Sequence, residues 1–222
     1  MAEQCYLVLI GDLIRSRDAD DRAGLQQRLQ DCLDTLNQQA GPALVSPYTL
    51  TLGDEFQAVR TGTTGLWTEL LQIRRAVLPE QVRFSLGLGT LATSINPKQA
   101  LGMDGPAFHI ARDGMEALKH QSGQFALGGL ASHDQRWANA LLATIDHMTR
   151  KWRANRFDIL HLLLTGHSPA DIAEALGLSV QAVYRNIRDG DLELIMELMQ
   201  LLDSLLTPAL ESPALTSPKP RS

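Results

Sequence analysis

One nine-residue stretch, Thr49–Gln57, limits the folds open to this chain more than any other part of the sequence. Before Gly53, apolar and threonine residues alternate with the period of a half-buried strand. Gly53-Asp54 is a turn dipeptide, and apolar residues recur after it as they would in a returning strand. The stretch therefore predicts a β-hairpin with Asp54 and Glu55 exposed side by side at its tip.

A second carboxylate follows the apolar run Leu7–Ile10, which is continuous, as in a central strand, and ends in Gly11-Asp12. Two strand ends that each carry an aspartate can hold a divalent cation between Asp12 and Asp54. Carboxylate oxygens suit Mg²⁺, whose remaining coordination positions a phosphate can fill. Each Gly-Asp pair could instead be an ordinary turn, because both residue types favour turns.

Helical and strand periodicities alternate along residues 1–131. Helices are expected over about 25–36, 66–77 and 106–119, and further strands at 82–88 and 125–127. The order β-α-β-β-α-β-α-β contains a split βαβ core: an antiparallel sheet with the first strand in its centre and helices on one face. That topology would bring Asp12 and Asp54 to one edge of the sheet.

Four runs of residues carry a family resemblance: L-V-L-I-G-D-L-I-R-S-R, L-G-D-E-F-Q, R-F-S-L-G-L-G-T and D-G-P-A-F-H-I-A-R. Together they resemble the SatD family across about residues 5–120. The amino-terminal half of that family is similar to the catalytic domain of class III nucleotide cyclases and diguanylate cyclases. The resemblance implies an α+β fold, with a ferredoxin-like, nucleotide-cyclase-like palm domain (βαββαβ core) at residues 1–131.

The resemblance also implies a set of metal and nucleotide residues. The metal ligands would be Asp12, Asp54 and the backbone carbonyl of Leu13, with Glu55 as an extra ligand. Gly53 and Glu55 would also lie beside the bound nucleotide. A further glycine, Gly105, ends the segment 102–105, which could cradle phosphate at the start of a helix or be a plain connecting loop.

The later part of the cyclase pattern is altered. Cyclases continue with a glycine, an asparagine four residues on and an arginine eight residues on, whereas here Gly105 is followed by His109 and Arg112. The purine-selecting lysine is replaced by Leu50. We take His109 and Arg112 as catalytic candidates, although the first could be a helix cap and the second a solvated charge. A leaving pyrophosphate without its arginine is poorly stabilised, which favours nucleotide binding over ordinary cyclase activity.

Residues 132–206 have helical periodicity throughout and predict an all-α domain. Within it, 168–188 have the spacing of a helix-turn-helix, with Ser168 and Ser179 as N-caps and Gly177 for a left-handed turn. The segment resembles the form seen in sigma-factor region four and related regulators.

In such a motif the second helix enters the major groove of DNA. The residues expected to contact DNA are Ser179, Gln181, Tyr184, Arg185 and Arg188. Glutamine can pair with adenine and arginine with guanine, while serine and tyrosine can contact phosphate. Residues 136–188 carry seven Lys/Arg against four Asp/Glu, a modest positive balance, and the motif could instead serve protein contacts.

The whole chain has a net charge of −5, which argues against a general polyanion binder. Cys5 and Cys32 lack metal-ligand spacing and are expected to be buried free thiols in a reducing compartment. Neither a basic leader nor an apolar run of about 18 residues is present, so we expect a cytoplasmic protein that crosses no membrane. The amphipathic segment 189–206 predicts a helix that packs on a partner, and 207–222 predict a disordered tail.

The hypothesis from the sequence is a ligand-responsive transcription factor. Its palm domain would bind a nucleotide with Mg²⁺, its helical domain would bind DNA, and a homodimer is expected because both domain types commonly pair. The alternative is a nucleotidyl cyclase or related phosphotransferase with a two-metal site. A third possibility is a protein-interaction module that binds neither ligand nor DNA.

Overall fold

The computed structural model describes residues 4–16, 20–51 and 53–211. In chain order the elements are β1 (Tyr6–Ile14), α1 (Arg22–Gln39), β2 (Leu44–Leu50), β3 (Glu55–Arg60), α2 (Leu66–Ala76), β4 (Gln81–Gly89), α3 (Pro106–Lys119), β5 (Phe125–Gly128), α4 (Ser132–Thr149), α5 (Ala154–Leu164), α6 (Pro169–Leu176), α7 (Val180–Asp189) and α8 (Leu192–Glu211). The element order predicted for the first half is confirmed. Leu52, expected to continue the alternation of the hairpin, lies outside the described residues.

The five strands form one sheet in the order β2-β3-β1-β4-β5. β1 is central and antiparallel to both β3 and β4, as the split βαβ arrangement requires. β5, however, is parallel to β4, so the expectation of an antiparallel sheet is wrong at this edge. The reason is that α3 connects the two strands, and a helical crossover returns the chain in the same direction.

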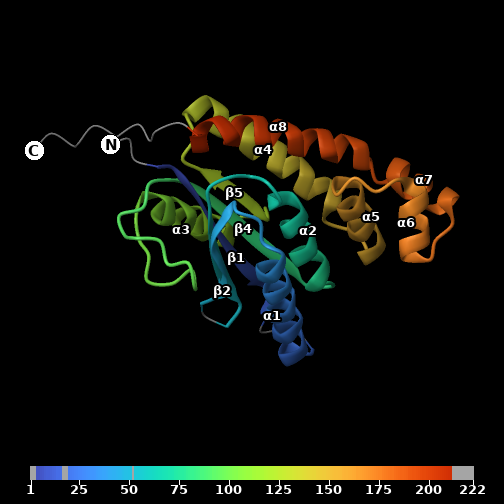
Figure 1. The fold of residues 1–222 in the computed structure, drawn as a ribbon, viewed down its shortest axis with the longest axis horizontal. Coiled ribbons are helices and arrows are strands. Elements are labelled where there is room, and N and C mark those ends of the chain that lie inside the picture. Colours follow the sequence, from blue (N-terminus) through green and yellow to red (C-terminus); the bar gives the residue numbers. More distant parts are fainter. Residues whose placement is uncertain (1–3, 17–19, 52, 212–222) are drawn as a thin grey trace, which may run out of the picture.

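Helices cover both faces of the sheet, and the prediction that they share one face is wrong (Figure 1). α1 and α2 pack on one face, where Leu7 and Leu9 of β1 are buried. α3 packs on the other, where Val8 and Ile10 join a second apolar cluster with Phe108. A strand that is apolar on both sides needs cover on both sides, which the run 7–10 already implied.

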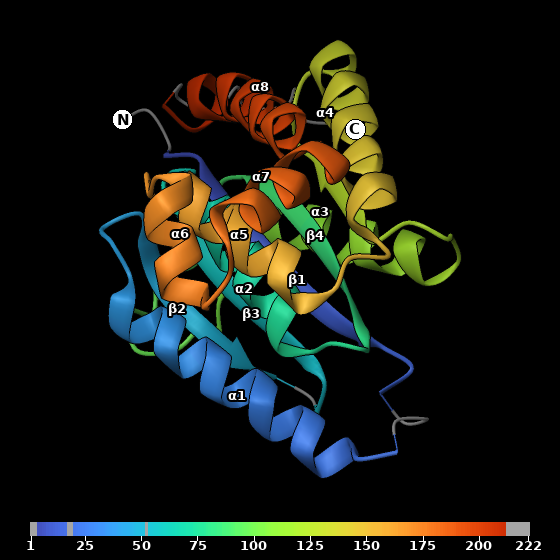
Figure 2. The ribbon, with the colours of Figure 1, turned by 90° about the vertical axis from the view of Figure 1, so that its right-hand side faces the viewer.

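The remaining helices extend the core of the first half (Figures 1 and 2). Leu70 of α2, Leu142 of α4 and Met199 of α8 belong to one apolar cluster that crosses the predicted domain boundary at residue 131. The apolar stripe of α8 packs within its own chain, which corrects the expectation that this stripe covers a partner. α8 also continues through Pro208 to Glu211, beyond the expected start of the tail.

Arg74 joins the two halves through polar contacts. This α2 side chain is 6% exposed and donates to Thr149 Oγ1 of α4 at 2.5 Å and to Gln124 Oε1, just before β5, at 3.3 Å. Its guanidinium also lies 5.7 Å from the Phe125 ring and 5.3 Å from the Phe157 ring. Burial lowers the pKa of Arg74 to about 10. One charged side chain therefore touches α4, α5 and the sheet edge.

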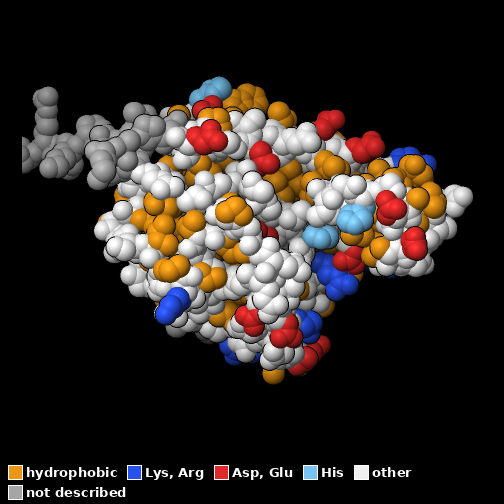
Figure 3. Space-filling view, viewed as in Figure 1, with side chains coloured by type: hydrophobic (Ala, Val, Ile, Leu, Met, Phe, Trp, Pro, Cys, Tyr) orange, Lys and Arg blue, Asp and Glu red, His pale blue; other side chains and the backbone are white. Residues whose placement is uncertain are grey.

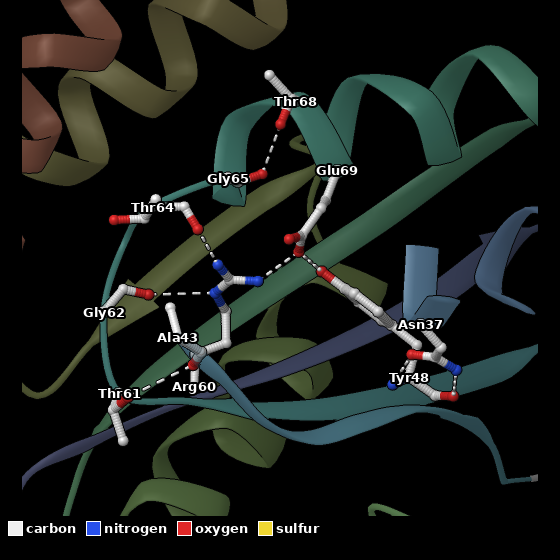
Figure 4. A network of polar contacts seen from close by, with 10 residues as sticks. All are labelled: Asn37, Ala43, Tyr48, Arg60, Thr61, Gly62, Thr64, Gly65, Thr68 and Glu69. Carbon is white, nitrogen blue, oxygen red and sulfur yellow. Dashed lines mark hydrogen bonds and ion pairs between the residues drawn. The ribbon is translucent and has the colours of Figure 1, made fainter. Parts of the chain in front are cut away.

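A second buried charge stabilises the hairpin and the loop before α2 (Figure 4). Arg60 is 1% exposed; its guanidinium pairs with Glu69 and donates to the carbonyl oxygens of Gly62, at 3.1 Å, and Thr64. Tyr48 Oη donates to Glu69 Oε2 at 2.6 Å. Burial raises the pKa of Tyr48 well above its ordinary value, so the phenol stays protonated and remains a donor.

Further observations concern two tryptophans, the cysteines and the membrane. Trp152 is buried, whereas Trp137 is 58% exposed. Cys5 is buried and Cys32 half-buried, and both are free thiols. Among the residues that the structure describes, no helix combines the length and apolarity needed to span a bilayer.

Candidate functional site

Asp12 lies inside β1, and the expectation that the strand ends at Gly11-Asp12 is wrong. Backbone pairing continues on both sides, with Asp12 opposite Glu55 of β3 and Arg83 of β4. These ladders extend the strand to Ile14 despite the turn signal. Side chains at these three positions therefore form a row across the middle of the sheet, on the face that α3 covers.

Asp54 lies in the turn between β2 and β3 and is half-buried, not exposed as expected. Its carbonyl oxygen accepts the backbone N–H of Leu13 at 3.1 Å. Its carboxylate Oδ2 accepts a hydrogen bond from the buried hydroxyl of Ser16. The hairpin turn is thereby joined to the end of β1.

Asp54, predicted to share a metal with Asp12, lies close enough for its charge to act on Asp12. Burial raises the pKa of Asp12, the hydrogen bond from Arg83 and the charge of Lys119 oppose that rise, and the negative charge of Asp54 adds to it. Arg83 Nη1 lies 3.1 Å from Asp12 Oδ2, and the two side chains are 17% and 14% exposed. Carboxylates that repel each other in a partly buried place gain from a shared cation.

The other predicted ligands lie around this pair. Leu13, which follows Asp12 in the chain, is buried. Gly53 is exposed in the turn, with φ +65°. Glu55 Oε1 accepts a hydrogen bond from Thr51 Oγ1 at 3.3 Å. Across the part of the chain that the structure describes, no group of three or more His, Cys, Asp and Glu side chains has the arrangement of a metal site. Two carboxylates nevertheless fit Mg²⁺, because this ion commonly binds one or two carboxylates and fills its shell with water or phosphate.

His109 and Arg112, predicted as catalytic, lie in the first half of α3. Lys119, whose charge is felt at Asp12, is the last residue of that helix, about 15 Å along the axis from His109. The structure therefore does not bring the predicted catalytic pair to the aspartates. Both side chains instead contact Asp104 Oδ1, at 3.1 Å from His109 Nε2 and 3.3 Å from Arg112 Nη1.

Asp104 also occupies the predicted phosphate cradle. A hydrogen bond from the backbone N–H of Gly105 is the main cause of its lowered pKa, with His109 and Arg112 contributing. Gly105 has φ +146°, and a Cβ there would lie 2.5 Å from the backbone nitrogen of Ala92, so glycine is needed for this close approach. The start of α3 thus already binds a carboxylate of its own chain.

α6 and α7 are joined by the short turn predicted from the sequence. Ser168 Oγ accepts the N–H of Asp171 at 3.2 Å, and the Asp171 carboxylate accepts the N–H of Ser168 at 3.1 Å, which forms a capping box. Gly177 ends α6 with φ +63°. Ser179 then caps α7 by accepting the N–H of Ala182 at 3.1 Å.

α7 presents a polar face to solvent. Val183 and Ile187 are its buried residues. All five residues predicted to contact DNA are exposed, and four of them lie on this helix: Gln181, Tyr184, Arg185 and Arg188, preceded by the cap Ser179. Tyr184 is 57% exposed, although it is a large aromatic side chain.

Positive charge near α7 is not gathered into one broad surface. Arg188 Nε donates to the neighbouring Asp189 at 3.0 Å, and Arg150 pairs with the buried Asp146. Arg156 lies over the Trp152 ring at 5.7 Å. On the side of the molecule drawn in Figure 3, acidic and basic side chains are interspersed.

Sequence reasoning missed three side chains near the aspartates: Ser16, Arg83 and Lys119. Arg83 had a usable signal, because the alternation of residues 82–88 places it on one face of a strand next to β1. Ser16 follows β1 in an irregular segment, and Lys119 reaches the site only through the packing of α3. No periodic pattern marks either residue.

Comparisons with known proteins give one family match. A family model described as the SatD family matches residues 6–201. A solved structure of a bacterial light-regulated adenylyl cyclase is 14% identical, with a TM-score of 0.38. That alignment covers 56% of this chain and 43% of the cyclase chain. No curated protein matches the sequence.

Proposed function

This chain belongs to the SatD family, and from that premise we propose that it is a DNA-binding transcriptional regulator whose sheet half binds a nucleotide with Mg²⁺. The observation that carries the proposal is the exposed polar face of α7, which follows a capped turn of helix-turn-helix length. A helix that presents Gln, Tyr and Arg side chains to solvent has the groups that read base edges and bind phosphate.

The nucleotide part of the proposal is supported by the aspartates of β1 and the hairpin. Asp12 and Asp54 are partly buried, repel each other and have oxygen donors suited to Mg²⁺. A bound Mg²⁺ would supply positive charge for nucleotide phosphates. His109 and Arg112 lie toward the other end of α3 and contact Asp104, so binding is favoured over turnover.

DNA binding is tested by fluorescence anisotropy with a labelled promoter fragment from upstream of the gene that encodes this protein. A scrambled fragment of the same length reports non-specific binding. Arg185→Ala should weaken binding to the promoter by about 10-fold or more, the loss of a base or phosphate contact. Arg136→Ala, on α4, is the control. Binding that is unaffected by Arg185→Ala and by salt would exclude this role for α7.

Nucleotide binding is tested by calorimetry with each nucleoside triphosphate and Mg²⁺. Asp54→Ala should abolish metal-dependent binding, whereas Asp104→Ala should not. Product formation from a triphosphate that Asp54→Ala eliminates would establish the cyclase or phosphotransferase alternative instead. Failure of both the DNA and the nucleotide assays would leave a protein-interaction module.

A further inference from the structure

Arg83 already pairs with Asp12, one of the two aspartates proposed to bind the metal ion. The register places Glu55, Asp12 and Arg83 side by side on three adjacent strands, so Asp12 has an acid on one side and a base on the other. Arg83 Nη1 lies 3.1 Å from Asp12 Oδ2. The guanidinium neutralises the Asp12 carboxylate through Oδ2, one of its two possible metal-binding oxygens.

The Arg83 side chain has unused hydrogen-bonding capacity and room beside it. Its Nε is buried and has no hydrogen-bond partner among the described residues. It lines a pocket of about 440 Å³ between the end of β1, the start of β4 and the turn after α3, together with Arg15, Glu80, Gln121 and Ser122. A displaced guanidinium could therefore turn into a polar space that already contains a second arginine.

We propose that Arg83 is a built-in counter-ion that a divalent cation must displace from Asp12, and that the freed guanidinium then binds the phosphates of the nucleotide. The inference rests on the proposed nucleotide function and adds a regulatory step to it. A divalent cation and a guanidinium held at the same carboxylate repel each other strongly. Metal binding alone is consequently weakened by Arg83, and nucleotide binding in the presence of metal is strengthened by it.

The test measures the two affinities separately by calorimetry, with Mn²⁺ alone and with imidodiphosphate analogues of ATP and GTP in saturating Mn²⁺. In Arg83→Gln the affinity for Mn²⁺ alone should rise at least threefold, because the competing charge is gone. The affinity for the triphosphate analogue should fall at least threefold. Damage to the fold would weaken the binding of both ligands. Opposite changes in the two affinities therefore identify the exchange of Arg83 between Asp12 and the phosphates.

Two variants serve as controls. Arg83→Lys keeps the positive charge and should bind Mn²⁺ much as the wild type does. Arg136→Gln removes an exposed guanidinium on α4 and should change neither affinity. Mn²⁺ affinity that is unchanged or lower in Arg83→Gln would overturn the inference.

Failure of the inference can be told from failure of the proposed function. If Asp54→Asn abolishes Mn²⁺ binding but Arg83→Gln leaves it unchanged, the metal site is real and only the role of Arg83 is wrong. If the wild type and Asp54→Asn bind Mn²⁺ alike, or neither these proteins nor Arg83→Gln binds it, the nucleotide function fails and the inference fails with it. Binding by Arg83→Gln but not by the wild type would support the inference most strongly.

Discussion

Arg60 is fully buried, and specific partners offset the free-energy cost of removing its charge from water. Its guanidinium pairs with Glu69, and Tyr48 donates to the same carboxylate. Removing one partner of a buried ion pair leaves the other charge without compensation, which is far more destabilising than replacing both. The sequence offered no sign of this, since Arg60 is the last residue of β3 and could equally have been solvated.

We expect Arg60→Met to lower the free energy of unfolding by about 3–5 kcal/mol, because Glu69 stays buried and loses its cation. The double variant Arg60→Met/Glu69→Gln keeps an acceptor for Tyr48 and removes the charge, so it should be more stable than the single variant. Urea unfolding followed by circular dichroism measures both. A double variant no more stable than Arg60→Met would show that the ion pair is not what stabilises this loop.

His161 of α5 gives stability a dependence on pH. Burial lowers its pKa below the ordinary 6.5, the charge of Asp158 only partly opposes this, and Nδ1 is buried with no hydrogen-bond partner among the described residues. Below pH 6.5 the unfolded chain binds a proton at this site more readily than the folded chain does. Stability from neutral His161 is thus present above that pH and lost as the pH falls.

His161→Gln should therefore flatten the loss of stability between neutral and mildly acidic pH. Thermal unfolding midpoints measured over that range test this, with His120→Gln, an exposed histidine, as the matched control. If the slope of the unfolding midpoint against pH changes equally in both variants, the role of His161 is contradicted.

At the scale of elements, the boundary of α6 depends on one backbone angle. Gly177 has φ +63°, and a Cβ added there would meet nothing within 4 Å, so only backbone strain opposes a larger residue. Gly177→Ala should lower the free energy of unfolding by about 1–2 kcal/mol. Gly41→Ala is the control, because Gly41 has equal free space and no positive φ. Equal effects in urea unfolding would mean that the turn does not need its left-handed residue.

Elements with strong local signals were predictable and those set by pairing were not. The helix bounds 106–119 are confirmed, because Pro106 suits a first helical position and the apolar stripe is regular. β1 was predicted too short because Gly11-Asp12 indicated a turn, whereas ladders on both sides carry the strand onward. The strand at 125–127 was predicted, but its parallel direction was missed, although a helix between two strands favours parallel pairing.

At the scale of the whole molecule, Arg74 tests whether the sheet half and the helical half unfold together. Arg74→Ala should lower the free energy of unfolding by about 2–4 kcal/mol, because it removes the hydrogen bonds to Thr149 and Gln124 and leaves a cavity between α4, α5 and the sheet edge. The neighbouring Arg75→Ala removes a half-exposed ion pair with Asp158 and should cost about 1 kcal/mol or less. Tryptophan fluorescence and circular dichroism should report one shared transition, and two separate transitions would contradict a common core.

The chain-wide arrangement could be predicted only in part. Its two kinds of secondary structure and their order followed from periodicity. The faces covered by α3 and α8 depended on contacts between distant residues, which no local pattern encodes. The same holds for the candidate site: the aspartates are marked by their motifs, whereas Arg83 and Ser16 reach them only through register and a turn.

α8 runs as one continuous helix from its contact with α7 to its contact with α2. Trp67 Nε1 of α2 donates to Asp203 Oδ1 at 2.9 Å, and eleven residues earlier Leu192 is buried where α8 meets α7. If α8 pivots about Asp203 by about 5°, its far end swings by about 1.4 Å over an arm of about 16 Å. A small tilt of α8 at its contact with α2 would thus displace α7 by a distance large enough to break a hydrogen bond.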